Sequence, residues 1–195
     1  MTSQVKNAIT ESIQIKIEAA DTLPEYIERA GELMVQCLID GGKILTCGNG
    51  SCAATASQFS SILLDRLARE RPSLPAINLV ADPIILSSMA NNGRFEDVFA
   101  RQVRALGTAK DILLVYSSKG QSKSIIKAIE SALSRDMLII AMTGADGGSV
   151  AGLVSGHDVE IRVPANSTAR ICEVHMLITH VLCDYIDNSL FGEQV

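Results

Sequence analysis

The fold of this chain is constrained most by an alternation of short β-rich apolar runs with segments of helical periodicity. The β-rich runs lie at residues 44–47, 76–80, 112–116, 138–143 and 159–163. Helical patterns separate most of them, as in the apolar stripe formed by Ile125, Ile129 and Leu133. Parallel strands need crossover connections, which are usually helices. The alternation therefore predicts a parallel sheet that is covered by helices on both faces.

Helices are expected at both ends of this alternating body. Residues 1–42 contain two helical patterns, and Thr22-Leu23-Pro24-Glu25 has the sequence of a capping box that starts the second helix. The last helix, from Thr168 to about Asn188, is apolar almost all round. Such a helix must be buried on several sides, which favours a subunit interface over the alternative of a central helix in a monomer. We divide the chain into an N-terminal helical pair, residues 1–42, which contributes to the interface, and a body, residues 43–195.

Composition and charge exclude several classes of function. The 195 residues carry a formal net charge of −5, and no basic stripe indicates direct nucleic-acid binding. No stretch has the length and apolar character of a membrane span, and the first residues lack the apolar core of a signal peptide. The cysteines lie in apolar contexts without CxxC spacing, so we expect reduced thiols and a cytoplasmic protein. They are Cys37, Cys47, Cys52, Cys172 and Cys183.

Two glycine-containing turns follow expected strands and precede expected helices. The first is Gly48-Asn49-Gly50-Ser51, and the second is Ser117-Ser118-Lys119-Gly120-Gln121-Ser122. Backbone N–H groups and hydroxyls at helix N-termini bind phosphate well. A serine in such a turn is often only a helix N-cap, but one cap does not account for three serines around Gly120. The pair of turns therefore predicts a phosphate cradle.

Several motifs across the whole chain resemble those of sugar isomerase (SIS) domain proteins. They include 48–51 followed by Ala53-Ala54, the run 70–76, Ala90-Asn91, the run 102–107, Thr143-Gly144 with 146–148, and 169–171. The nearest branch looks like bacterial phosphoheptose isomerase and its non-enzymatic relative, the DnaA initiator-associating protein. The resemblance implies a three-layer αβα sandwich with a flavodoxin-like parallel sheet and a homotetramer with sugar-phosphate sites between subunits. It also implies the phosphosugar-binding residues: Ser51, Ser117, Ser118 and Ser122 around the phosphate, with Asn49 and Asn91 nearer the sugar. Lys119 departs from the family, which usually has a small hydroxyl residue there, and it either adds a point charge to the phosphate or fills the pocket.

The catalytic positions of the resembling isomerases are altered here. Those enzymes use a His and a Glu after the first glycine turn, with a Gln and a His in the last helix, as a zinc site. The matching positions in this chain are Gln58, Ile62, Cys172 and His180. Ile62 can neither bind metal nor transfer a proton, and zinc needs three or four good ligands. We therefore expect no zinc and no other cofactor, with His180 as the catalytic residue only if the chain is an isomerase.

Two functions follow from these observations. The first is a non-catalytic, phosphosugar-binding scaffold that gathers DnaA molecules at replication initiation, with Leu190 and Phe191 displayed at each subunit's tail for the partner. The altered catalytic positions favour this hypothesis. The alternative is a phosphoheptose isomerase that acts on sedoheptulose 7-phosphate in lipopolysaccharide-precursor synthesis, and the whole-chain resemblance favours it. The sequence leans towards the scaffold and away from an enzyme.

Overall fold

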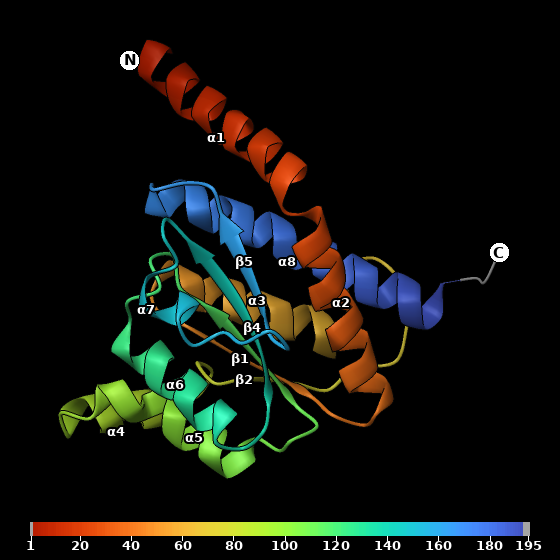
Figure 1. Ribbon diagram of the computed structural model, residues 1–195, viewed down its shortest axis with the longest axis vertical. Coiled ribbons are helices and arrows are strands. Elements are labelled where there is room, and N and C mark those ends of the chain that lie inside the picture. The colour runs from red at the N-terminus through yellow and green to blue at the C-terminus, as the bar shows by residue number, and fades with distance from the viewer. Residues whose placement is uncertain (1, 193–195) are drawn as a thin grey trace.

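The computed structural model describes residues 2–192 and shows one mixed α/β body built on a parallel sheet (Figure 1). The sheet has five strands in the order β2-β1-β3-β4-β5, and all neighbouring pairs are parallel. The strands are β1 (Ile44–Gly48), β2 (Ala76–Asn78), β3 (Ile112–Tyr116), β4 (Leu138–Gly144) and β5 (Val159–Val163). The predicted parallel sheet is confirmed, and its strand order is that of flavodoxin-like folds.

Helices cover both faces of the sheet. One layer contains α2 (Pro24–Ile39), α3 (Ser51–Leu64) and α8 (Thr168–Phe191), and the other contains α4 (Pro83–Asn91), α5 (Val98–Leu106) and α6 (Lys123–Leu133). Figure 1 shows α4, α5 and α6 together below the strands, with α8 at their upper side and α2 to the right. The 3₁₀ turn Phe95–Asp97 precedes α5, and the short helix α7 (Gly148–Ala151) follows β4. The expected three-layer αβα sandwich is confirmed.

Alternate residues of each strand enter different cores. In β3, Leu114 and Tyr116 pack with α3 and α8, whereas Leu113 and Val115 pack with α5 and α6. Every residue of β3 is buried, because helices cover both of its faces. This two-sided burial explains why the strand sequences are continuously apolar instead of alternating with polar residues.

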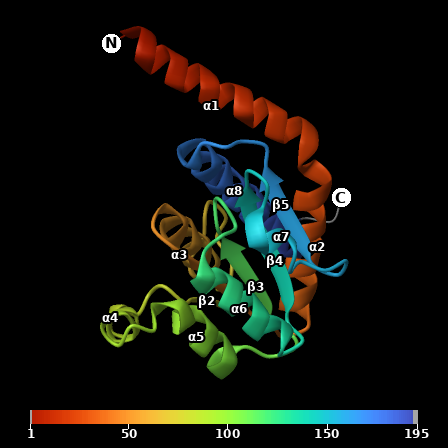
Figure 2. The same cartoon turned by 60° about the vertical axis from the view of Figure 1, so that its left-hand side comes forward.

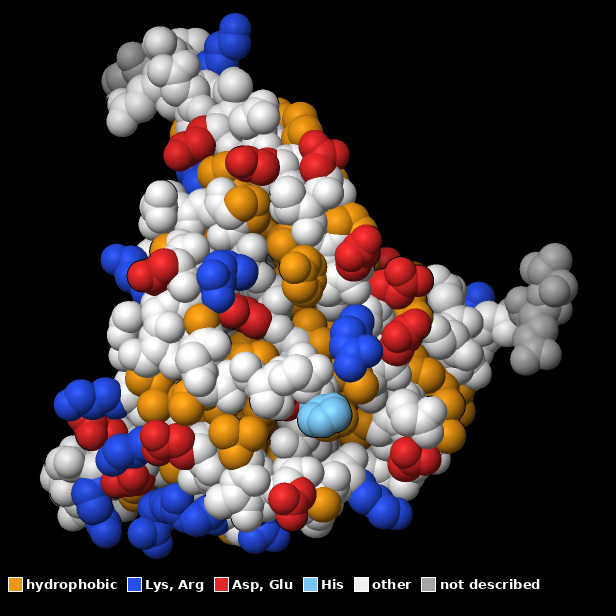
Figure 3. All heavy atoms as spheres, viewed as in Figure 1, with side chains coloured by type: hydrophobic (Ala, Val, Ile, Leu, Met, Phe, Trp, Pro, Cys, Tyr) orange, Lys and Arg blue, Asp and Glu red, His pale blue; other side chains and the backbone are white. Residues whose placement is uncertain are grey.

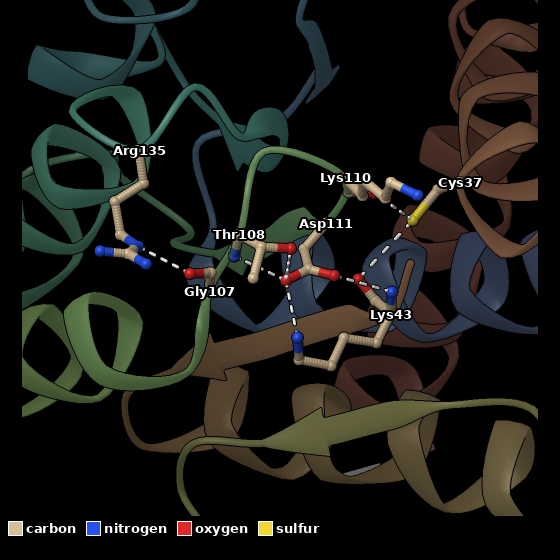
Figure 4. Close-up of polar contacts among 7 residues, drawn as sticks. All are labelled: Cys37, Lys43, Gly107, Thr108, Lys110, Asp111 and Arg135. Atoms are coloured by element: carbon tan, nitrogen blue, oxygen red, sulfur yellow. Dashed lines mark hydrogen bonds and ion pairs between the residues drawn. The ribbon is translucent and has the colours of Figure 1, made fainter. Parts of the chain in front are cut away.

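Polar contacts fix the starts of the two central strands (Figure 4). The Asp111 carboxylate accepts hydrogen bonds from the Lys43 backbone N–H at 3.0 Å and from its Nζ at 2.7 Å. It also accepts from the Thr108 backbone N–H at 2.7 Å. Although burial opposes ionisation, these donors lower the pKa of Asp111. The carboxylate thus ties the beginning of β1 to the beginning of β3, at the amino ends of the strands, whereas the glycine turns follow their carboxyl ends.

The first helix, α1 (Thr2–Thr22), extends away from the body (Figures 1 and 2). Val5, Ile9, Ile13 and Ile17 on this helix are each at least half exposed, and Figure 3 shows hydrophobic side chains among charged ones on the projecting arm. The expected capping box is wrong. Leu23 is the N-cap of α2 without a side-chain hydrogen bond, and the Thr22 hydroxyl instead donates to the carbonyl of Glu18.

Helices α3 and α8 lie side by side and run in the same direction. Ser51, at the start of α3, contacts Cys172 near the start of α8. Arg71, which follows the end of α3, binds Asp187 near the end of α8. The last helix is therefore packed on the body, yet Leu177 and Val181 on it remain more than 40% exposed. Among residues 2–192, no helix combines the length and apolar character that crossing a membrane requires.

Candidate phosphate-binding site

The two glycine turns meet at the carboxyl ends of the adjacent strands β1 and β3. Strand order reverses here, since β2 lies on one side of β1 and β3 on the other. Crevices at such a switch point are the usual ligand sites of open α/β sheets. A small cavity of about 180 Å³ opens between the turns. It is lined by Asn49, Cys52, Tyr116, Ser117, Ser118, Lys119, Gln121 and Ser122.

Glycine is required where the two turns bend. Gly50 precedes α3 with a φ of 56°, and Gly120 has a φ of 62° in the second turn. A Cβ on Gly120 would also meet the carbonyl oxygen of Gly147. Left-handed backbone at these points costs glycine little and other residues more. The turns thus bring the N-terminal ends of α3 and α6 next to the cavity.

Hydrogen bonds connect the two turns directly. The Asn49 amide donates to the Ser122 hydroxyl at 2.8 Å and to the Ser124 hydroxyl at 2.9 Å. The two serines are themselves 3.1 Å apart. Ser122 also serves as the N-cap of α6, where its carbonyl accepts from Ile125 and Ile126. Asn49 therefore holds the first turn against the helix that begins at the second.

The second turn presents its residues at different depths. Ser117 is buried, and its N–H donates to the Met142 carbonyl at 2.9 Å. Ser118 is half-buried, and Lys119 is exposed at the rim. The lysine ammonium is a point charge on a flexible stem, so Lys119 can approach an anion in the cavity without a fixed geometry.

Two residues of the predicted set lie outside the lining. Asn91 is the last residue of α4, is exposed, and belongs to the helical layer on the other face of the sheet. Ser51 is exposed beside the cavity, where its hydroxyl is 3.2 Å from the Cys172 sulfur. The structure therefore brings together Asn49 and the residues of the second turn, whereas Asn91 does not join them.

The positions that match the isomerase zinc site do not form one here. Gln58 is exposed, Ile62 is 3% exposed in the apolar core, and Cys172 and His180 are half-buried. Across residues 2–192, no group of three or more His, Cys, Asp or Glu side chains is placed to hold a metal ion. Asp65 is the first carboxylate after Ile62 in the sequence, and it is exposed at the C-cap of α3, about 20 Å along the helix from Ser51, too far from the cradle to replace the missing glutamate. The donor set at these positions does not fit zinc.

Sequence analysis missed four residues of this region: Cys52, Tyr116, Gln121 and Ser124. Tyr116 ends β3 and is fully buried, with its hydroxyl 2.9 Å from that of Thr179, and burial raises its pKa. It packs edge-to-face on His175. His175 is fully buried, with Nε2 2.9 Å from the Thr143 carbonyl. A tyrosine that ends a strand was the available sequence clue.

The tail residues Leu190 and Phe191 are not exposed as expected. Both are half-buried and pack against the core beneath α3 and α8. Arg69 also donates a hydrogen bond to the Phe191 carbonyl. The expectation of a freely displayed Leu-Phe pair is therefore wrong, because the end of α8 lies against its own subunit.

The fold and the cradle together define an α/β protein with a candidate phosphate-binding site at its strand-order switch. The family model described as "SIS domain" matches residues 9–144, and the chain belongs to this family. It is 56% identical over 193 residues to a phosphoheptose isomerase of Shewanella denitrificans, covering 99% of this chain and 98% of the relative. The relative from Shewanella frigidimarina gives the same identity and coverage and bears the same name.

Solved structures agree with this assignment. A phosphoheptose isomerase from Francisella tularensis superposes with a TM-score of 0.93 and 44% identity, covering 96% of this chain and 98% of that one. The enzyme from Neisseria gonorrhoeae gives 0.90 and 43%, with the same coverage. These relatives overturn the expectation of a non-catalytic, DnaA-gathering scaffold. The altered residues at 58, 62 and 172 suggested lost catalysis, but proteins so similar over their whole length are named as enzymes.

Proposed function

We propose that this protein is a sugar-phosphate isomerase of the phosphoheptose isomerase type, which interconverts sedoheptulose 7-phosphate and its aldose isomer. The observation that carries the proposal is the pair of joined glycine turns at the β1/β3 switch point, in a chain 56% identical to phosphoheptose isomerases. The similarity extends over 99% of this chain and 98% of that relative, so the proposal covers the whole chain.

The cradle would bind the substrate phosphate. Ser118 and Ser122 offer hydroxyls, the start of α6 offers backbone N–H groups, and Lys119 offers a positive charge at the rim. Asn49 holds the two turns at a fixed separation. Binding here orients the open-chain sugar, and such positioning makes a large contribution to catalysis.

Proton transfer must take place at the other end of the substrate. The phosphate is on C7, whereas the ketose loses a proton from C1 and the enediol gains one at C2. His180 lies on α8, eight residues beyond Cys172 or about 12 Å along the helix, and is half-buried. We assign the proton transfer to His180, since an imidazole can both accept and donate a proton and the reacting carbons lie away from the cradle.

This proposal does not use the zinc ligands of the resembling isomerases. An exposed Gln58, a buried Ile62 and a half-buried Cys172 do not supply three good ligands around His180. We therefore propose that turnover is insensitive to a chelator such as EDTA. Loss of activity in EDTA, with recovery on addition of zinc, would contradict this part of the proposal.

We further propose that the protein works as a homotetramer in the cytoplasm. Leu177 and Val181 on α8 and the row of apolar side chains on α1 are exposed in a single chain, and a second copy would cover them. The free thiols suit a reducing compartment. Light scattering tests the tetramer, and a stable monomer at micromolar concentration would contradict it.

The test of function is a discontinuous assay in which NMR follows conversion of sedoheptulose 7-phosphate by the purified protein. We expect conversion by the unaltered chain and a loss of about 100- to 10,000-fold in His180→Ala. His157→Ala is the matched control, because His157 is exposed in the loop before β5, at the amino ends of the strands, whereas the cradle lies at their carboxyl ends. Absence of conversion by the unaltered chain would overturn the proposed function.

A further inference from the structure

Two thiols lie next to the phosphate cradle without a role in binding or proton transfer. Cys52 is in the first turn of α3 and lines the cavity. Cys172, on α8, packs against the core cluster that contains Cys52, and its sulfur is 3.2 Å from the Ser51 hydroxyl. The two cysteines thus come from helices that are distant in sequence and meet at the mouth of the site.

The two thiols differ in how accessible they are. Cys52 is 5% exposed, and burial together with the neighbouring Cys172 thiol raises its pKa to about 11. Cys172 is half-buried, and the exposed Ser51 hydroxyl is placed to donate to its thiolate. An accessible sulfur beside a second, shielded thiol is the arrangement of a cysteine that is oxidised and then resolved.

Cys52 also lies in the cradle itself. It lines the same small cavity as Ser118 and Ser122, two of the serines proposed to bind phosphate. Any reaction that turns the Cys52 sulfur towards Cys172 therefore changes the wall of this cavity.

The other cysteines lack these features. Cys37 donates to the carbonyls of Lys43 and Lys110, which lie at the amino ends of β1 and β3, opposite the cradle. Cys47 is fully buried within β1, and Cys183 is 1% exposed in α8. These three sit in the core, away from the mouth of the site.

We propose that Cys172 and Cys52 form a redox modification site that controls phosphate binding, with a hydroperoxide as oxidant. The Cys172 thiolate attacks the peroxide, the O–O bond breaks, and the products are a Cys172 sulfenic acid and hydroxide. The Cys52 thiol then attacks the sulfenic sulfur, an S–S bond forms, and water leaves. For hydrogen peroxide the sum is two thiols and one peroxide giving one disulfide and two waters. A dithiol reductant reverses the reaction by thiol–disulfide exchange.

The disulfide would act on the cradle through α3. It ties the first turn of α3 to α8 and turns the Cys52 sulfur out of the cavity wall that it shares with Ser118. The start of α3 and Ser118 both belong to the proposed phosphate site, so phosphate affinity falls in the oxidised protein.

The experiment treats the full-length protein with one equivalent of hydrogen peroxide, blocks remaining thiols, and maps peptides by mass spectrometry. We expect a peptide pair that joins Cys52 to Cys172 with the loss of two hydrogen atoms. Calorimetry with inorganic phosphate should show binding to the reduced protein, loss of that heat after oxidation, and recovery with dithiothreitol. Neither measurement depends on isomerase turnover, so the result is independent of the proposed reaction.

Two variants complete the test. Cys172→Ser should form no disulfide at Cys52 and should keep phosphate binding after peroxide, whereas the control Cys183→Ser should behave like the unaltered protein. Circular dichroism verifies that both variants are folded. If a variant does not fold, the peptide mapping of the unaltered protein still tests whether the disulfide forms. A disulfide between other cysteines, no disulfide, or unchanged phosphate affinity in the cross-linked protein would each overturn the proposal.

Discussion

Replacement of Arg71 by alanine should strongly destabilise the fold. Arg71 Nε donates to the Asp187 carboxylate at 2.8 Å, and the two side chains are only 1% and 8% exposed. The same guanidinium donates to the carbonyls of Ile62 and Leu63 at 2.8 and 2.7 Å, which are among the last carbonyls of α3. Arg71 therefore joins the end of α3 to the end of α8.

The magnitude follows from what the substitution leaves behind. Removal of one partner of a buried ion pair costs about 3–5 kcal/mol, because the other charge stays buried without compensation. In Arg71→Ala that charge is the Asp187 carboxylate, and the carbonyls at the end of α3 also lose their donor. For a chain of this length the loss corresponds to a fall in melting temperature of roughly 6–20 °C.

The assay is urea unfolding followed by circular dichroism at fixed protein concentration, since association changes apparent stability. Arg66→Ala is the matched control: Arg66 pairs with Glu70 nearby, but the two side chains are 46% and 82% exposed. An exposed pair of this kind contributes about 0–1 kcal/mol. The reasoning would be refuted if the free energy of unfolding of Arg71→Ala were within about 1 kcal/mol of that of the unaltered protein, or if Arg71→Ala lost no more stability than Arg66→Ala.

Three further predictions follow from the structure. Burial lowers the pKa of His175 from 6.5 to about 4, so the unfolded chain binds the proton first as pH falls, and about 2 kcal/mol of stability is lost between pH 7.5 and pH 5. Urea unfolding at both pH values checks this, and a His175→Gln variant with the same pH dependence would contradict it. Ser118→Ala combined with Ser122→Ala should abolish the heat of phosphate binding in calorimetry while leaving the circular dichroism spectrum unchanged; retained binding would place the ligand elsewhere. Ile178→Asp should unfold the chain or dissociate its assembly, because Ile178 is 2% exposed and an unpaired carboxylate there has no compensation. Light scattering measures the mass of the assembly and circular dichroism measures folding. A variant with unchanged mass and an unchanged spectrum would contradict the prediction.

The fold was largely predictable because its signals are local. Each strand shows as a short apolar run, and the intervening helices show as stripes such as Ile125 and Ile129, both buried in the final structure. Short-range propensity also misled. Thr22 to Glu25 has a capping-box sequence, but α1 and α2 are separated by a single residue, so no free helix start exists for Thr22 to cap.

The candidate site was predictable only in part. The two glycine turns were recognisable because each joins a strand to a helix in sequence, and in the structure they meet as expected. Asn91 was assigned to the same site by resemblance, but its helix lies in the other layer of the sandwich. The function predicted from the sequence is wrong for a different reason: the residues at a few catalytic positions favour a scaffold, whereas the chain is similar over 99% of its length to a phosphoheptose isomerase.

The sequence by itself determined the parallel α/β architecture and the two glycine turns, because hydrophobic periodicity and glycine placement act over a few residues. Tertiary structure alone decided which distant residues meet. Arg71 and Asp187 are 116 positions apart, and Ser51 and Cys172 are 121 positions apart, yet each pair is in contact. Both contacts arise because α3 and α8 pack in parallel on one face of the sheet, and packing of that kind depends on the shape of the whole core.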